Sequence, residues 1–337
     1  MSEEALKKGR WVKLICGASN QDLPSISDLC ALYATAGVHC IDVAADAAVV
    51  YAARQALDWV EKHQGKRPWL MISVSDGKDA HFRKAWFDPK RCPPDCNRPC
   101  QQICPAKAIG TTGGINSQKC YGCGRCLNTC PYGIIKEEER RLELKDFPPL
   151  LSELRPDAIE IHTAPGRIND FEETLSKLME SDIQLKRLAV SCGIQGHNIT
   201  AEELSVELWK RYKCLRQYKQ KPLWQLDGRR MSGDLGAGTA SVAVGLWRKV
   251  SPIAPPGPIQ LAGGTNRYTI QHLKGNHGPE GVAFGGMART MIQPWLIKSQ
   301  EKQISLRDWP EGWQQALTEA KKLIHPWLSR NLDVQIC

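Results

Sequence analysis

Eight short apolar runs recur along the chain, separated by longer stretches in which apolar and polar positions alternate at helical spacing. Each run is four to seven residues long and is nearly continuous in its apolar character, which is typical of strands buried on both faces of a sheet. Short runs of this length are too brief for helices that bury one face. The predicted strands are residues 11–16, 39–44, 68–74, 157–162, 185–191, 221–227, 258–262 and 281–284.

The stretches between these runs have helical signals at both ends. Asp46 can cap a helix over 47–63, Gly37 fits the end of a helix over 27–37, and Thr200 with Glu203 forms a capping-box pattern. Strands alternating with helices indicate a parallel sheet, and eight such units favour a closed (β/α)8, TIM-like barrel; an open doubly wound sheet is the alternative. Further helices are expected over 170–180, 200–218 and 239–250, in a short turn from 269, and in a tail from 305.

The alternation stops after the third strand and resumes at the fourth, and the interruption is rich in cysteine. The first half of its pattern is Cys92-x3-Cys96-x3-Cys100-x3-Cys104-Pro105, and the second is Cys120-x2-Cys123-x2-Cys126-x3-Cys130-Pro131. The second half matches the ferredoxin run, in which the last cysteine binds the other of two iron–sulfur clusters. The spacing predicts two [4Fe–4S] clusters, one held by Cys92, Cys96, Cys100 and Cys130 and one by Cys104, Cys120, Cys123 and Cys126.

Zinc and disulfides are the alternatives for these eight thiols. Zinc needs only four ligands per site and does not call for Cys-Pro twice, and disulfide frameworks belong to small secreted domains. The spacing in the first half is wider than usual, so we expect the first cluster to be held loosely and to allow a [3Fe–4S] form. We expect residues 1–80 and 146–300 to form the barrel, 81–145 an iron–sulfur insertion and 301–337 a helical tail.

Glycine pairs follow the last two predicted strands, where barrels often bind phosphate because backbone N–H groups can approach the oxygens. Gly263 and Gly264 follow strand seven, and Gly285, Gly286 and Arg289 follow strand eight. These residues are candidates for binding a phosphate or FMN, but tight strand-to-helix turns need glycine in any case. For residues 233–238, a tight strand-to-helix turn is likewise favoured over a nucleotide site, because the stretch lacks the Gly-Lys-Ser/Thr ending of a P-loop.

Other titratable residues lie at or beyond predicted strand ends, and none of the histidines forms a recognisable hydrolytic triad with Ser or Cys. The acids that could line a pocket are Asp42, Asp46, Asp76, Glu160 and Asp227, and the histidines are His162, His197, His272 and His277. Cys16, Cys30 and Cys40 are expected to be structural, and Cys192 a buried thiol. A catalytic residue cannot be chosen from this set without geometry.

Composition narrows the class of protein only slightly. The chain has 337 residues, 42% of them hydrophobic and 24% charged, and a net charge of +9. This charge is compatible with contact to an anionic membrane surface, but no nucleic-acid motif accompanies it. The N-terminus has no apolar core of a signal peptide, no apolar run reaches the length of a membrane span, and thiolate-bound clusters indicate a reducing cytoplasm.

Three further stretches, taken with the cysteines, resemble the cyanobacterial light-dependent period family (LdpA). They are WVKLICGAS at 11–19, CIDVAAD at 40–46 and QLDGRRMSGD at 225–234. The resemblance implies an iron–sulfur protein on an input path to the circadian clock, with the eight cysteines as ligands. It also implies redox sensing, clock-input proteins as partners, and a link to the quinone pool. An iron–sulfur oxidoreductase that passes electrons to a flavin or substrate at the barrel mouth is the alternative function.

Overall fold

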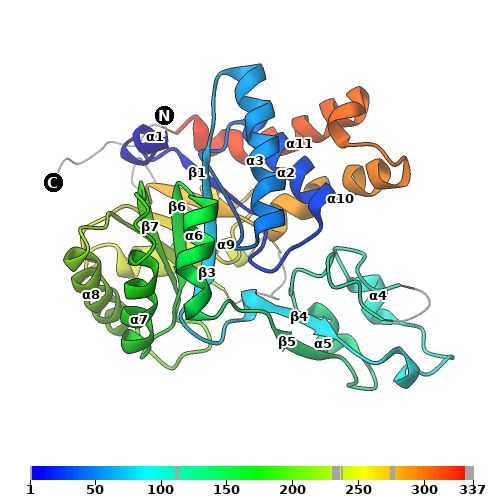
Figure 1. Cartoon of the computed structure of the whole chain (residues 1–337), viewed down its shortest axis with the longest axis horizontal. Helices are drawn as coiled ribbons and strands as arrows, with labels where there is room; N and C mark the ends of the chain where they lie inside the picture. Colours follow the sequence, from blue (N-terminus) through cyan, green and yellow to red (C-terminus); the bar gives the residue numbers. More distant parts are fainter. Residues whose placement is uncertain (1, 111–113, 230–235, 237, 274–277, 331–337) are drawn as a thin grey trace.

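The computed structural model describes residues 2–110, 114–229, 236, 238–273 and 278–330, and its core is a closed barrel of parallel strands (Figure 1). All eight predicted strands are present and the barrel prediction is confirmed. Around the barrel each strand is hydrogen-bonded to two neighbours, in the order β1-β10-β9-β8-β7-β6-β3-β2. The strands are β1 (Trp11–Ile15), β2 (Cys40–Ala44), β3 (Trp69–Ser75), β6 (Ala158–His162), β7 (Arg187–Cys192), β8 (Pro222–Asp227), β9 (Ile259–Ala262) and β10 (Gly281–Phe284).

Helices surround the barrel, and the predicted caps form. The side chain of Asp46 accepts from the Val49 amide at the start of α3 (Ala47–Gln64), and Gly37 ends α2 (Leu23–Ala36) with a φ of 114°. The capping box opens α8 (Ala201–Gln217). The other predicted helices are α7 (Ile168–Met179), α9 (Thr239–Val250), the 3₁₀ turn η4 (Thr269–His272) and α11 (Pro310–Leu328), which packs on α2 and α10.

Among the described residues outside the cysteine segment, three α-helices were not predicted. The sequence of α6 (Phe147–Leu154) contains two prolines, but both lie in its first turn, where a missing N–H costs nothing. The helix α10 (Gly286–Glu301) starts at a glycine pair and contains Pro294, so its pattern reads as a loop. The short α1 (Ser2–Lys7) inserts Leu6 into the cluster that closes one end of the barrel.

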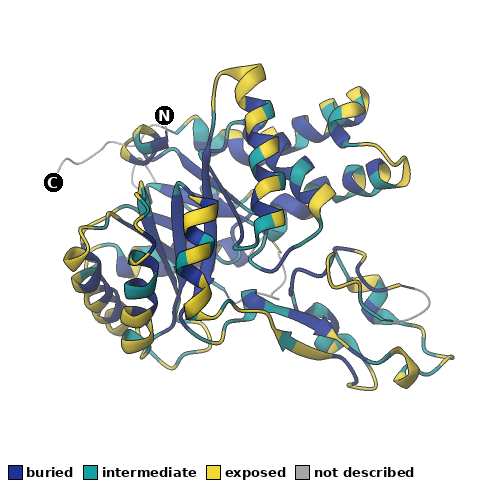
Figure 2. Ribbon diagram, viewed as in Figure 1, coloured by how far each residue is buried: buried dark blue, intermediate teal, exposed yellow. Residues whose placement is uncertain are grey.

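Side chains fill the barrel interior in layers. At the N-terminal end of the strands, apolar residues including Trp11, Met71 and Leu223 form a closed plug. The next layer is polar: Lys13, Asp42 and Glu160 are all buried there. Outward-facing residues of the strands pack on the helices, so the strands are buried on both sides, as Figure 2 shows. The polar layer is therefore sealed below and opens only toward the C-terminal ends of the strands.

The cysteine segment leaves the barrel after β3 and returns before β6, and β3 and β6 pair directly. Its stalk is an antiparallel hairpin of β4 (Arg83–Trp86) and β5 (Lys136–Glu139), and the segment carries the short helices α4 (Pro99–Ile103) and α5 (Arg125–Thr129). The prediction of an insertion is confirmed. Among the described residues, no helix is both long and apolar enough to cross a membrane.

Candidate functional site at the barrel mouth

The insertion is tied to the C-terminal end of the barrel by hydrogen bonds from the stalk strand β4 and from Lys119. The Ser19 hydroxyl, in the loop after β1, donates to the Arg83 carbonyl at 3.0 Å. Lys84 is buried and donates to the Gln21 side chain at 2.6 Å. On the other side, Lys119 reaches the Gln300 side chain of α10 at 3.2 Å. These contacts fix the cysteine-bearing loops over the mouth of the barrel (Figure 1).

Four of the eight cysteines surround one apolar cavity inside the insertion. The cavity is lined by all the members of the predicted second set, Cys104, Cys120, Cys123 and Cys126. Burial, together with the neighbouring Cys123, Cys120 and Cys104, raises the pKa of the Cys126 thiol to about 12. Four thiols that disfavour one another's ionised form need a cationic group between them to be deprotonated together, which an iron–sulfur cluster supplies.

The other four cysteines form a second neighbourhood that includes the last cysteine of the second motif. Burial raises the pKa of Cys100, and so do the nearby thiols of Cys130, Cys92 and Cys96. The crossed grouping expected from the Cys-x3-Cys-Pro elements is thus present in the arrangement of the side chains. The assignment of each cysteine to a cluster stays a prediction.

Backbone amides also point at the sulfur atoms, as they do around iron–sulfur clusters. The amide of Ala85 donates to Cys120 Sγ at 3.4 Å, and that of Ala108 to Cys104 Sγ at 3.3 Å. Burial alone would raise the pKa of Cys130, but the amides of residues 132–135 lower it on balance. The cysteine environment therefore fits thiolate ligands.

A cavity of about 140 Å³ opens where the insertion meets the barrel mouth. All five residues proposed for phosphate or flavin line it: Gly263, Gly264, Gly285, Gly286 and Arg289. Arg289 donates to the Cys16 carbonyl at 3.1 Å and lies 5.0 Å from the centre of the Tyr121 ring. Cys123 lines this cavity as well as the one inside the insertion, and Tyr121 and Arg125 belong to the same shared wall.

Below the cavity, the polar layer forms one connected network. Lys13 pairs with Glu160 and lies 3.5 Å from Asp42 Oδ2. Burial would lower the pKa of Lys13, but Glu160 and Asp42 raise it above its usual value. This amine therefore stays protonated and is a poor nucleophile. Burial would raise the pKa of Glu160, but Lys13 and His162 hold it at about 2. Lys13 is therefore an electrostatic support for the acids around it.

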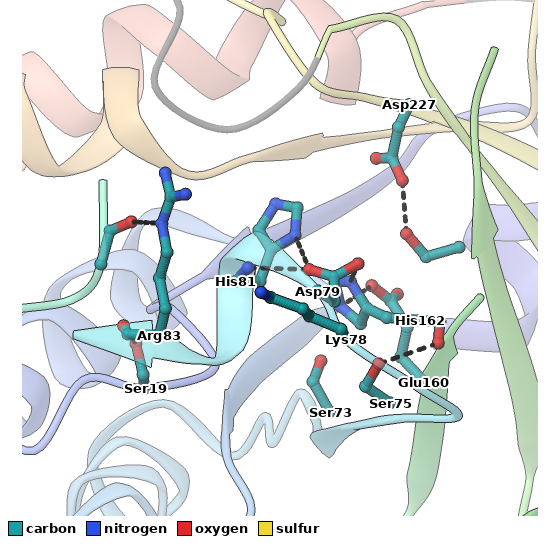
Figure 3. A network of polar contacts seen from close by, with 12 residues as sticks. Ser19, Ser73, Ser75, Lys78, Asp79, His81, Arg83, Glu160, His162 and Asp227 are labelled. Atoms are coloured by element: carbon teal, nitrogen blue, oxygen red, sulfur yellow. Dashed lines mark hydrogen bonds and ion pairs between the residues drawn. The ribbon is translucent and has the colours of Figure 1, made fainter. Parts of the chain in front are cut away.

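The mouth of the barrel also carries two imidazoles between carboxylates. His162 Nε2 lies 3.1 Å from Glu160 Oε1, and His81 Nδ1 lies 2.7 Å from Asp79 Oδ1 (Figure 3). Burial would lower the pKa of His162, but Glu160 and then Asp79 raise it to about 9. On the far side, Ser191 donates to Asp227.

Not every candidate residue reaches this site. Asp46 caps α3, and Asp76 pairs with Arg167 at 3.2 Å, so neither lines the cavity. His272 lies in η4 and His197 in the loop after β7, also outside the cavity lining. His277 and most of 233–238 lie outside the described residues. Cys16, Cys30, Cys40 and Cys192 are buried, as predicted.

Sequence reasoning missed several residues of the site. Lys13 stands inside an apolar run, and nothing in that run indicates what its amine contacts. Asp79 and His81 lie between the third strand and the cysteines, in a stretch with no recognisable motif. Gln225 and Gln260, whose side chains hydrogen-bond at 2.8 Å between the neighbouring strands β8 and β9, gave no signal except their place in buried strands.

Two family models match the chain. Residues 92–141 match the LdpA Fe-S cluster-binding domain, and residues 150–326 match the light dependent period A C-terminal domain. A curated relative from Synechococcus elongatus, light dependent period A, is 43% identical over 96% of this chain and 92% of its own. The chain belongs to the light dependent period A family. Its cysteine insertion is thus an iron–sulfur binding domain, which confirms an iron–sulfur cofactor.

Matches outside this family are partial or distant. An uncharacterized ferredoxin of Methanocaldococcus jannaschii is 36% identical over 21% of this chain and 40% of its own. Among solved structures, tryptophan synthase of Mycobacterium tuberculosis matches with a TM-score of 0.47 and 11% identity, over 96% of this chain and 93% of that one. Thiamine phosphate pyrophosphorylase of Pyrococcus furiosus matches with a TM-score of 0.42 and 9% identity, over 96% and 100%.

Proposed function

We propose that this protein is an iron–sulfur redox sensor that passes the redox state of a light-dependent process to the circadian clock. The observation that carries the proposal is the position of Cys123, a thiol in the wall of both the cluster cavity and the barrel-mouth cavity. The relative from Synechococcus is named for a light-dependent period. A sensor of this kind needs a redox centre next to a surface that can change, and the barrel mouth supplies it.

The sensing step is electrostatic. A thiolate-bound cluster gains one negative charge when it is reduced, and nearby groups respond to this charge. Tyr121 and Arg289 lie between Cys123 and the loop after β1, because the guanidinium is stacked on the ring and bonded to the Cys16 carbonyl. Added charge at the cluster attracts Arg289 and weakens its bond to that carbonyl. The result is a different surface at the mouth in each redox state.

The proposed cofactors are two clusters with the crossed ligand sets. Cys104, Cys120, Cys123 and Cys126 hold a [4Fe–4S] cluster, and Cys92, Cys96, Cys100 and Cys130 hold the other. The second of these is more exposed, since only Cys100 of its ligands is buried, and it is the one that can lose an iron to become [3Fe–4S]. Clock-input proteins and a quinone are the proposed partners, with contact at an anionic membrane surface and a cytoplasmic location.

The ligand sets can be tested by removing one cysteine from each motif. Anaerobically purified protein should contain about eight irons, and Cys130→Ala should damage the cluster of Cys92, not that of Cys120. EPR spectra of the reduced protein, compared with those of Cys92→Ala and Cys120→Ala, identify the signal that is lost. If Cys130→Ala and Cys120→Ala remove the same signal, the crossed assignment is wrong.

A second function is favoured by the cavity itself. All five glycine and arginine candidates line it together, beside a cluster ligand, which is the arrangement needed to pass electrons from a cluster to FMN or a substrate. The spectrum of the purified protein after acid precipitation distinguishes the two functions. Released flavin, with absorbance near 450 nm, supports the oxidoreductase; a flavin-free extract from protein with full iron content supports the sensor.

A further inference from the structure

Three side chains at the barrel mouth converge on one point that the iron–sulfur sites do not include. Asp79 caps the 3₁₀ turn η1 (Ala80–Phe82), which carries His81, and His162 is the last residue of β6. One ligand atom from each of Asp79, His81 and His162 lies within 4.8 Å of the other two. Figure 3 shows both imidazoles turned toward the same carboxylate. This spacing is suitable for three ligands on one face of a metal ion.

The orientation of His162 fits that of a metal ligand. Its Nε2 lies 3.1 Å from Glu160 Oε1, while its Nδ1 faces Asp79 Oδ2 at 4.0 Å. A metal-binding histidine usually donates its other ring N–H to a carboxylate, which fixes the ring and its tautomer. Glu160 is fully buried and is itself held by Lys13, so it is a rigid acceptor for that proton. Nδ1 of His162, the ring nitrogen that does not face Glu160, points toward Asp79.

Acidic side chains outnumber the amine and the two imidazoles in this part of the barrel. Asp42, Glu160, Asp79 and Asp227 contribute four carboxylates to the network, and Lys13 is the amine that pairs with two of them. Buried charge that is not paired is costly. A divalent cation beside Asp79 would supply the positive charge that a proton on His162 supplies in the metal-free protein.

We propose that Asp79, His81 and His162 bind one divalent first-row transition-metal ion at the barrel mouth. Two histidines and one carboxylate on one face are a known donor set for such ions, and they leave the remaining positions open. His81 and His162 line the 140 Å³ cavity, so those open positions face it. The ligand class expected there is water or a small anion that can bind directly to the metal. The site does not depend on the proposed sensor function.

The test uses the full-length protein with its clusters intact. Mn²⁺ is titrated in at room temperature and the free ion is followed by its six-line EPR signal, because cluster signals are broadened beyond detection at that temperature. Zn²⁺ is then added, which should displace Mn²⁺ because it binds such sites more tightly. Iron and sulfide content and the visible spectrum show whether each sample keeps its clusters. One Mn²⁺ per chain is expected.

The informative variants are Asp79→Asn and His81→Ala, because both side chains are only partly buried and their loss should spare the fold. Each should weaken Mn²⁺ binding by at least about tenfold. His325→Ala, an exposed histidine on α11, is the matched control and should bind like the wild type. His162→Gln gives a further check, since it keeps a polar group beside Glu160.

Two results would overturn the proposal. The first is the absence of saturable Mn²⁺ and Zn²⁺ binding in protein with full iron content, which would mean that protonated histidines balance the acids. The second is stoichiometric binding that Asp79→Asn and His81→Ala leave unchanged, which would place the metal elsewhere. Loss of binding in His325→Ala to the same extent would also contradict it.

Discussion

The barrel and the cysteine insertion are stabilised by different forces within one chain. The barrel buries a continuous apolar core between its strands and helices, and its interior charges are paired. The insertion has a small core in which eleven residues are buried, and Cys100, Cys120 and Cys126 are three of them. Figure 2 shows the contrast: buried strands in the barrel, and mostly half-buried or exposed chain in the insertion. We therefore expect packing to stabilise the barrel and metal–thiolate bonds to stabilise the insertion.

Removing the clusters should give the largest difference between the two regions. Oxidation with ferricyanide in the presence of EDTA should unfold the insertion, because its small core cannot offset the entropy of ordering its loops. Hydrogen exchange should show loss of protection across the stalk, β4 and β5, and across α5, while β2 and β6 stay protected. EDTA alone is the control. Protection of α5 that survives complete loss of iron would contradict this comparison.

The converse experiment lowers the stability of the barrel without changing the insertion. Lys13→Met leaves Glu160 and Asp42 without their buried cation, which should cost about 3–5 kcal/mol of the free energy of unfolding. Denaturant unfolding followed by circular dichroism measures this loss, and the cluster absorbance under native conditions should not change. Lys8→Met, which breaks the exposed pair with Glu4, is the control and should cost less than about 1 kcal/mol. Equal losses in the two variants would show that the buried network contributes little.

The two regions also differ in how far sequence predicts them. The barrel strands and the cysteine sets follow from local patterns, since apolar runs and ligand spacings are written in neighbouring residues. The roles of the residues that lie between the two regions cannot be predicted from such local patterns. Lys13 and Asp79 take their roles from side chains far away in sequence, Glu160 and His162, and such pairs become visible only when the barrel closes. The helix α10 was missed for a local reason, because Gly286 and Pro294 hide its helical pattern.

Acid should weaken the barrel through a half-buried histidine at its closed end. His39 stacks on Trp11 and accepts from the Val12 amide at Nδ1, and burial lowers its pKa from 6.5 to about 4. Between these two values the unfolded chain binds a proton that the folded chain does not. Stability is therefore full above about pH 6.5 and falls as the pH is lowered toward 4.

His39→Asn keeps an acceptor for the Val12 amide but does not titrate. From pH 7.5 to 5.5 the wild type should lose about 1 kcal/mol more of its free energy of unfolding than the variant does. Denaturant unfolding at the two pH values measures the difference. His63→Asn, on the exposed end of α3, should behave like the wild type. A parallel loss in wild type and His39→Asn would rule out this histidine as the cause.

The smallest expected effect compares the two clusters with each other. Arg125 begins α5 beside Cys126 and Cys123, whereas Lys90 lies next to the first cysteine motif. The proline-rich first motif offers few amide donors, although the amides around Cys130 partly compensate. Reduction adds negative charge, so the cluster of Cys120 should be reduced more easily than the cluster of Cys92.

Arg125→Glu should lower the midpoint of the Cys120 cluster by on the order of 50 mV, from the Coulomb energy of two charges at this distance in a well-screened site. Lys90→Glu should lower only the midpoint of the Cys92 cluster. EPR-monitored redox titrations of the wild type and both variants measure the two midpoints. Identical midpoints in the wild type, or a shift of both clusters by either variant, would mean that local charge does not set the difference between them.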